Sequence, residues 1–286
     1  MPKTKRLKIY RAGNVEKAVL WTTPMPNDNE RDRRSKSTAT RLAREFINTE
    51  NRELNDKAAL NRLELSLAGN FAPYDLFTTL TYSEEWLPSE KKESENRKIL
   101  KNNIRSYNKK LRNIRKKRGK SLKYIYSIGG REAEPSKDIS ESTRYHIHMV
   151  VNSTGNIKQD IEDIQSLWIY GEVYIDYISS GKTYGRTYGE IAGYFGKQNP
   201  LRPNGAQLYV CSKNLLTIND FVVFNDYVED NTTLMIPDRA EPLGDQSGHP
   251  DGGAGFLAYY KCLYTPASPG YEPYPKCLRS HRNDRK

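Results

Sequence analysis

The alternation of strand-like and helix-like segments between residues 75 and 212 constrains the fold of this chain most strongly. The strand-like runs are rich in aromatic and β-branched residues and occupy 75–82, 122–128, 144–152 and 172–178. Apolar residues at helical spacing mark 93–118 and 156–167, and a short helix at 187–198 and a strand at 207–212 follow. The order β-α-β-β-α-β predicts an α+β core with an antiparallel or mixed sheet and helices packed on it in the ferredoxin-like manner.

The segments on either side of this core have weaker patterns. Residues 1–34 are polar, so we expect them to be mostly irregular, whereas good helix formers from about 37 to 67 predict a broken helix or a helical pair. Residues 237–254 are rich in Pro, Gly and Asp and predict a loop or linker in a largely irregular C-terminal region. The chain therefore divides into a partly helical N-terminal extension, a core domain and a C-terminal region without an assigned role, at 1–70, 71–215 and 216–286.

The composition indicates a polyanionic partner. The net charge is +11 and the pI is about 9.3, which favours nucleic acid or an anionic membrane. Membrane is the weaker candidate, because no window approaches the roughly 18–20 apolar residues of a spanning helix and the N-terminus lacks the apolar core of a signal peptide. Cys211, Cys262 and Cys277 are odd in number and widely spaced, which excludes a disulfide framework and a Cys-x-x-Cys zinc site. We expect a cytoplasmic protein.

Cations are concentrated in the helix predicted at 93–118. Acids near its start are confined to Glu93 and Glu95, whereas a solvated charged helix normally mixes both signs. Its apolar residues are expected to face the sheet and leave the cations outward: Ile99, Ile104, Leu111 and Ile114. The outward cations include Arg97, Arg115 and four that we expect to contact DNA phosphates, namely Arg105, Lys109, Arg112 and Lys116. A merely soluble helix face is the alternative.

Two of the four histidines lie on one predicted strand, in Arg144-Tyr145-His146-Ile147-His148. Successive strand residues point to opposite faces, so His146 and His148 project from the same face. Two imidazoles on one rigid strand form half of a divalent metal site. An incidental pair of histidines on a strand is the alternative for this motif alone.

The short helix at 187–198 contains Tyr194 and Lys197, which share a face because they are three residues apart. A phenol is a poor nucleophile at its free pKa of about 10, and a neighbouring ammonium favours the phenolate or neutralises charge on a phosphate. The pair is therefore chemically suited to attack on a phosphodiester, although the pattern by itself is weak in a chain with 20 tyrosines.

The three motifs together carry more weight. Phe77-Thr78-Thr79-Leu80-Thr81, His146-Ile147-His148 and Tyr194-Phe195-Gly196-Lys197, in this order over about 75–215, resemble the HUH endonucleases and most closely the rolling-circle replication initiators of plasmids and small single-stranded DNA phages. The resemblance implies that His146 and His148 bind Mg²⁺ or Mn²⁺ and that Tyr194 is the nucleophile. Lys197 would assist the tyrosine or contact the scissile phosphate.

The resemblance also implies a third metal ligand, often a glutamate just upstream of the histidines. Glu132 and Glu134 both lie in the preceding loop, and we choose Glu132 because it is nearer the strand end. The chain departs from the family pattern here, since Gly129-Gly130 occupy the place where the carboxylate is most expected. Some relatives use two tyrosines, but we expect a one-tyrosine enzyme, with Tyr184 and Tyr188 as the other candidates.

The function that the resemblance implies is nicking and joining of single-stranded DNA at a replication origin, through a 5′-phosphotyrosine intermediate. Gly181-Lys182-Thr183 resembles the end of a phosphate-binding P-loop, but Asp176 stands where that motif requires its first glycine, so we expect no helicase-type ATPase in this chain. A host helicase and a host polymerase are therefore the expected partners, in the cytoplasm of a bacterial host. A relaxase or a single-tyrosine transposase would use the same chemistry. The alternative of another class is a non-catalytic nucleic-acid-binding protein whose sheet tyrosines stack on bases: Tyr124, Tyr126, Tyr174 and Tyr177.

Overall fold

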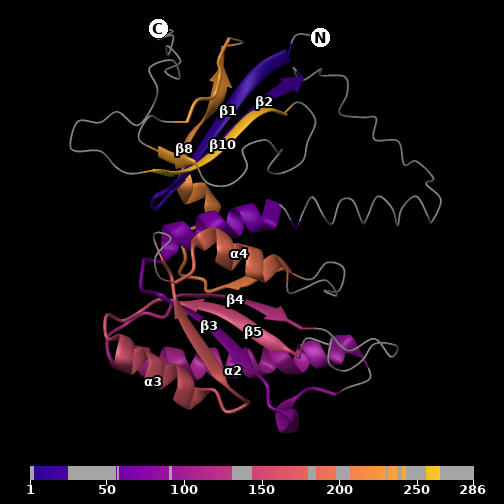
Figure 1. Ribbon diagram of the computed structural model, residues 1–286, viewed down its shortest axis with the longest axis vertical. Coiled ribbons are helices and arrows are strands. Elements are labelled where there is room, and N and C mark those ends of the chain that lie inside the picture. The colour runs from indigo at the N-terminus through magenta and orange to yellow at the C-terminus, as the bar shows by residue number, and fades with distance from the viewer. Residues whose placement is uncertain are drawn as a thin grey trace, which may run out of the picture. The chain divides into compact units, whose positions relative to one another are not determined.

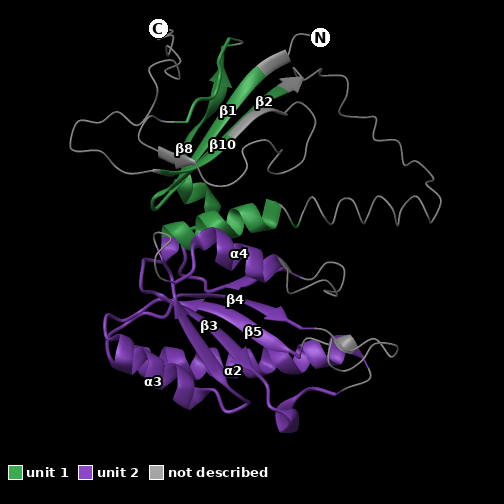
Figure 2. Cartoon of the chain, viewed as in Figure 1, with its two compact units in different colours: residues 1–69, 216–286 green, residues 70–215 purple. Residues whose placement is uncertain are grey.

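The chain forms two compact units, each with its own five-stranded sheet. One unit comprises residues 70–215, and the other combines residues 1–69 with 216–286 (Figure 2). The computed structural model describes residues 3–24, 56, 58–89, 92–130, 144–179, 185–197, 207–229, 231–236, 240–242 and 256–264. None of the helices in these ranges is long and apolar enough to cross a membrane.

The sheet of residues 70–215 has the order β6-β3-β5-β4-β7, and every neighbouring pair is antiparallel. Its strands are β3 (Leu76–Thr81), β4 (Tyr124–Gly129), β5 (His146–Val151), β6 (Val173–Tyr177) and β7 (Val210–Cys211). The first four strands therefore have the spatial order 4-1-3-2 of a ferredoxin-like core. The predicted α+β class and the order β-α-β-β-α-β are confirmed.

The helices of this unit cover both faces of the sheet (Figure 1). α2 (Glu93–Lys117) and α3 (Ile157–Leu167) pack on one face, where the core of the unit lies. α2 contributes buried residues at helical spacing: Leu100, Ile104, Tyr107 and Leu111. α4 (Tyr188–Lys197) covers the opposite face, where the ring of Phe195 lies 6.5 Å from that of Phe77. A short 3-10 helix, η1 (Glu84–Trp86), follows β3.

Strand register gives the two faces different chemistry. Leu80 pairs with Ile147 and faces α2, whereas Thr79 pairs with His148 and Thr81 with His146 on the face toward α4. All six residues of β5 are buried, because this central strand is covered on both sides. The histidines therefore lie in a protected position rather than on an open surface.

One predicted outward cation is buried instead. Arg115 has no exposed side-chain surface, and its Nη2 donates to Asp160 Oδ1 at 3.3 Å while its Nη1 donates to Asn152 Oδ1 at 2.9 Å. Arg97 is also buried. The expectation that all these cations face outward is wrong at both positions. Arg115 is buried because its side of α2 packs against α3 and the loop before it, whereas Arg97 lies beside Tyr126 and Leu208.

The other unit contains an antiparallel sheet in the order β8-β1-β2-β10-β9. Its strands are β1 (Lys3–Ala12), β2 (Val15–Pro24), β8 (Val222–Val228), β9 (Ala240–Pro242) and β10 (Phe256–Tyr264). A 3-10 helix, η3 (Ile218–Phe221), precedes β8. β9 lies within the segment predicted as a loop or linker, and the other residues of that segment lie outside the described ranges.

The expectation that residues 1–34 are mostly irregular is wrong over residues 3–24, which form a β-hairpin. Leu7 and Ile9 pair with Leu20 and Ala18, and all four side chains are buried. Polar residues lie next to them on both strands, so the segment is polar overall although one side of it forms a core. Gly13 closes the turn with φ +55°, and a side chain there would lie 2.3 Å from the Ala68 carbonyl oxygen.

Part of the predicted N-terminal helix is present in this unit. Residues 58–69 are helical, and Leu63 and Leu67 are fully buried. Glu64 accepts hydrogen bonds from the Lys261 ammonium at 2.9 Å, which joins this helix to β10. The predicted helical residues before 56 lie outside the described ranges.

Candidate active site

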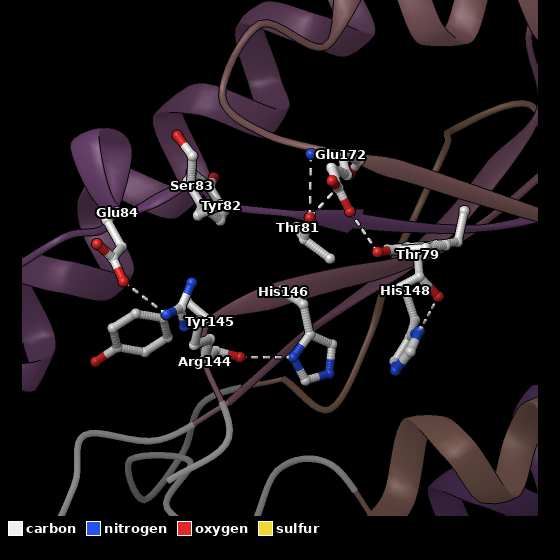
Figure 3. Close-up of a pocket in the computed structure, with 11 residues that line it drawn as sticks. Thr79, Thr81, Tyr82, Ser83, Glu84, Arg144, Tyr145, His146, His148 and Glu172 are labelled. Atoms are coloured by element: carbon white, nitrogen blue, oxygen red, sulfur yellow. Dashed lines mark hydrogen bonds and ion pairs between the residues drawn. The ribbon is translucent and has the colours of Figure 1, made fainter. Parts of the chain in front are cut away.

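The histidine pair lies at the centre of the sheet of residues 70–215. The rings of His146 and His148 are 4.7 Å apart between centroids, at an interplanar angle of 71° (Figure 3). Both side chains are buried. The pleat of β5 therefore places two imidazoles on one face, as the sequence pattern predicts.

A backbone carbonyl sets the proton position on His146. Its Nδ1 lies 2.8 Å from the Arg144 carbonyl oxygen, which can only accept a hydrogen bond. Neutral His146 therefore carries its proton on Nδ1 and has a free lone pair on Nε2. This is the usual orientation of a metal-binding histidine, whose other nitrogen donates to a carbonyl or carboxylate.

His148 has a free nitrogen in a buried position. Its Nδ1 lies 3.0 Å from the Thr79 hydroxyl, whereas its Nε2 is buried without a hydrogen-bond partner. Burial, His146 and Arg186 lower the pKa of His148 to about 3, so the ring is neutral at physiological pH. When Nδ1–H donates to Thr79, Nε2 presents a lone pair. An unpaired buried polar atom is costly, and a metal bond at Nε2 would satisfy it.

These observations fit a divalent metal on the pair. Among the described residues, no group of three or more His, Cys, Asp or Glu has the arrangement of a complete metal site. Glu132 and Glu134 lie in 131–143, outside the described residues, so the third ligand stays a prediction.

The backbone conformation at the end of β4 explains why a glycine precedes this loop. Gly130 has φ +90°, and a Cβ there would lie 2.6 Å from the Arg144 carbonyl oxygen. Gly129 pairs directly with His146 across β4 and β5. At Gly130, one of the two positions where the family pattern favours a carboxylate, the backbone of Arg144 therefore excludes a side chain.

Tyr194 lies on the histidine side of the sheet. α4 places its ring 5.9 Å from that of His148 and 6.2 Å from that of Phe77, between centroids. Lys197 is the last residue of α4, and its side chain lies outside the described part of the chain. The structure thus brings together His146, His148 and Tyr194 from two elements 46 residues apart, counted from His148 to Tyr194.

Tyr188 has a different environment from Tyr194. Its hydroxyl donates to the Phe71 carbonyl at 2.9 Å, the side chain is buried, and burial raises its pKa to about 12. It therefore anchors the start of α4. Tyr184 lies outside the described residues.

Arg186 is a site residue that the sequence did not reveal. Its guanidinium carbon lies 4.4 Å from the centroid of the Tyr194 ring and 5.8 Å from that of Phe77. Its Nε donates to Asp176 Oδ2 at 3.1 Å. No local motif marks this arginine, because its neighbours come from β3, β6 and α4.

A cavity of about 770 Å³ adjoins the histidines. Thr79, Thr81, Glu172 and Tyr174 line it together with both imidazoles (Figure 3). Glu172 accepts from the Tyr174 hydroxyl, and Arg144 pairs with Glu84 at 2.8 Å. The volume is within the range of ligand pockets. His148 lines the cavity and also lies next to Tyr194, whose ring is 5.9 Å away between centroids.

The predicted DNA-binding cations of α2 are not part of this site. Arg105, Lys109, Arg112 and Lys116 are all exposed, but α2 covers the face of the sheet opposite the histidines. Single-stranded DNA bound at Tyr194 can reach these cations only by passing around an edge of the sheet.

The four sheet tyrosines considered for base stacking do not form one platform. Tyr124 and Tyr126 lie on the face toward α2, and Tyr126 is buried there. Tyr174 is exposed on the histidine face, whereas Tyr177 pairs with Leu76 on the other face. Strand alternation therefore divides the four tyrosines between the two faces of the sheet, so they could not stack on one bound strand of nucleic acid together.

A four-stranded antiparallel core with a histidine pair on its central strand and a tyrosine helix over it has the arrangement of a Rep-type protein. Residues 75–199 match the family model Replication-associated protein ORF2/G2P, a family of rolling-circle replication initiators. The matched segment runs from β3 to α4 and contains all three sequence motifs. The predicted resemblance is confirmed over this segment, which is similar to that family. No curated protein and no solved structure is significantly similar to it.

Proposed function

We propose that this chain initiates rolling-circle replication by nicking and rejoining single-stranded DNA at an origin, with Tyr194 as the nucleophile. The observation that supports this most directly is the convergence of His146, His148 and Tyr194 on one face of the sheet, with ring separations of 4.7 and 5.9 Å. The match to a replication-associated family favours this role over that of a relaxase or transposase, which would use the same chemistry.

The metal would be Mg²⁺ or Mn²⁺, held by Nε2 of both histidines and by a carboxylate, for which Glu132 is the candidate. When bound, such a cation polarises a non-bridging oxygen of the phosphodiester. Arg144 and Thr79 orient the two imidazoles, so the nitrogen lone pairs are arranged before the metal binds.

The covalent step is a transesterification. The Tyr194 oxygen attacks the phosphorus, the bond from phosphorus to the 3′ oxygen breaks, and the phenolic proton ends on that oxygen. The products are a 5′-phosphotyrosine and a free 3′-OH. One phosphate ester replaces another, so the reverse reaction can rejoin the strand.

Two cations would support this step. Arg186 lies over the Tyr194 ring, and its guanidinium has the planar donor geometry that suits a phosphate. Asp176 holds Arg186 in place through its Nε. Lys197 would assist the tyrosine or contact the scissile phosphate.

The partners follow from the products. The 3′-OH would prime a host polymerase, and a host helicase would open the duplex in the bacterial cytoplasm. The exposed cations of α2 would contact DNA phosphates beyond the site, around the edge of the sheet.

The proposal can be tested by trapping the covalent intermediate. The full chain is incubated with Mn²⁺ and a single-stranded oligonucleotide library of random sequence labelled at the 3′ end, and adducts are resolved on denaturing gels. We expect an adduct with the wild type and none with Tyr194→Phe. Tyr188→Phe makes the same chemical change on the same helix and should keep the adduct. Equal adduct from Tyr194→Phe and wild type would exclude Tyr194 as the nucleophile.

A further inference from the structure

The sheet of residues 1–69 and 216–286 carries a row of cationic and aromatic side chains across three strands. Arg6 on β1 pairs in register with Trp21 on β2 and with Tyr227 on β8. Its guanidinium carbon lies 5.9 Å from the Trp21 ring centroid and 5.6 Å from that of Tyr227. The guanidinium therefore lies between two aromatic rings on one face of the sheet.

The row continues along β1. Lys8 follows Arg6 on the same face, and its ammonium lies 4.8 Å from the ring centroid of Tyr10. We define the cation–aromatic face as Arg6, Lys8, Tyr10, Trp21 and Tyr227. It combines two cations with three aromatic rings on neighbouring strands.

This face is not part of the apolar core that β1 and β2 share. Leu7, Ile9 and Leu20 alternate with its residues and bury their side chains on the opposite side. Tyr227 is 48% exposed, and the other four members are half-buried. The face therefore holds solvent-accessible rings that packing within that core does not explain.

The two cations of this face have no carboxylate partner within the described part of the chain. Arg6 donates to the Asn225 amide oxygen at 3.2 Å, and in the described ranges neither Arg6 nor Lys8 forms a salt bridge. Asp226, the carboxylate of β8, pairs with Leu7 and so belongs to the opposite face. A partner with negative charge and flat apolar groups would complement this arrangement.

We propose that the cation–aromatic face binds single-stranded nucleic acid, with bases stacked on Trp21 and Tyr227 and phosphates at Arg6 and Lys8. Aromatic rings on a sheet stack on unpaired bases, whatever their sequence, and interleaved cations follow the backbone. Bases in a duplex are already stacked on one another, which favours a single strand. This site belongs to the other unit from Tyr194 and does not depend on nicking.

Photo-crosslinking tests the site in the intact wild-type chain. Single-stranded DNA with 5-iodouracil is bound, irradiated and digested, and the crosslinked peptides are identified by mass spectrometry. We expect crosslinks at Trp21, Tyr10 or Tyr227. Crosslinks confined to residues 70–215 would overturn the proposal.

Binding measurements separate this site from the nicking site. Fluorescence anisotropy with a labelled oligothymidine should show about tenfold weaker binding for Tyr227→Ala and for Trp21→Leu. Arg6→Gln combined with Lys8→Gln should reduce the slope of log affinity against log salt by about 1.4, which is about 0.7 for each lost phosphate contact. Because Tyr227 is exposed, its variant tests the site even if Trp21→Leu does not fold.

Lys5→Gln is the matched control, since Lys5 lies on the same strand but faces the other side, where its ammonium donates to the Thr232 carbonyl. It should leave the affinity and the slope at wild-type values. With saturating DNA, the Tyr194 adduct should form at wild-type level in the variants of the face, so failure of nicking and failure of this site are distinguishable. Unchanged affinity in all of these variants, or equally tight binding of a duplex, would contradict the proposal.

Discussion

The guanidinium of Arg186 lies over the ring of Tyr194, 4.4 Å from its centroid, and Asp176 holds it there through a hydrogen bond of 3.1 Å. This contact joins the loop before α4 to the tyrosine and to the end of β6. It also brings a permanent positive charge close to His148, whose pKa it helps to lower.

Arg186→Gln should reduce the rate of Tyr194 adduct formation by about 100- to 1,000-fold, in the range found for removal of a donor that stabilises developing charge. Arg186→Lys should recover only part of the rate, because an ammonium lacks the planar donor fork. The rate is measured as single-turnover adduct formation at saturating oligonucleotide. Lys213→Gln, at an exposed position, is the control for charge loss. Wild-type rates in Arg186→Gln would remove this residue from the mechanism.

His148 should make the metal-free protein less stable in acid. The folded ring has a pKa of about 3, whereas the unfolded ring titrates near 6.5, so between these values the unfolded state binds the additional proton. The contribution to stability is complete above about pH 6.5 and declines as the pH falls toward 3. Urea unfolding across this range should show a shallower pH dependence in His148→Gln than in the wild type. Parallel curves would contradict the shifted pKa.

Metal binding should stabilise the fold through the histidine pair. At Mn²⁺ about 100-fold above its Kd, the expected gain is about 2.7 kcal/mol, measured as a rise in Tm. His146→Gln and His148→Gln should each lose most of this rise, whereas Tyr194→Phe should keep it. A rise that survives both histidine substitutions would place the metal elsewhere.

Gly130→Ala should damage the metal site without touching a ligand. Its Cβ would lie 2.6 Å from the Arg144 carbonyl oxygen, which orients His146, and the φ of +90° adds backbone strain. We expect weaker Mn²⁺ binding by titration calorimetry together with lower stability. Gly119→Ala is the matched control, because Gly119 also has positive φ, +69°, but has no atom within 4 Å of the added Cβ. It should cost about 1 kcal/mol and leave metal binding intact.

The buried pair of Arg115 and Asp160 should be essential to the fold of the core domain. Asp160 also accepts hydrogen bonds from the backbone N–H and the hydroxyl of Thr154, at 2.7 and 2.9 Å. Asp160→Ala leaves a buried guanidinium uncompensated and should cost about 3–5 kcal/mol in urea unfolding. Arg112→Gln, on the exposed side of α2, should change stability by less than about 0.5 kcal/mol. Equal effects of the two would contradict the buried pair.

The sequence predicted those features that depend on local periodicity. The strands and helices of 75–212, the projection of His146 and His148 from one face and the position of Tyr194 on a helix follow from spacings of two and of three to four residues. The hairpin of β1 and β2 was not predicted, because the residues that complete its core, Val228 and Tyr260, lie more than 200 residues away along the chain. The local sequence pattern of a strand does not reveal which distant strands it pairs with.

By itself the sequence therefore determined the α+β class and the motif order, because both follow from residue type and local spacing. The resemblance of the ordered motifs to a known family supplied the candidate roles of the histidines and the tyrosine. Only the tertiary structure decided which side chains share an environment. It buried Arg115, placed the cations of α2 on the face away from the histidines, set Arg186 over Tyr194 and left Nε2 of His148 without a partner. The physical reason is that hydrogen bonding, burial and charge act between neighbours in space, and strand register and helix packing determine those neighbours.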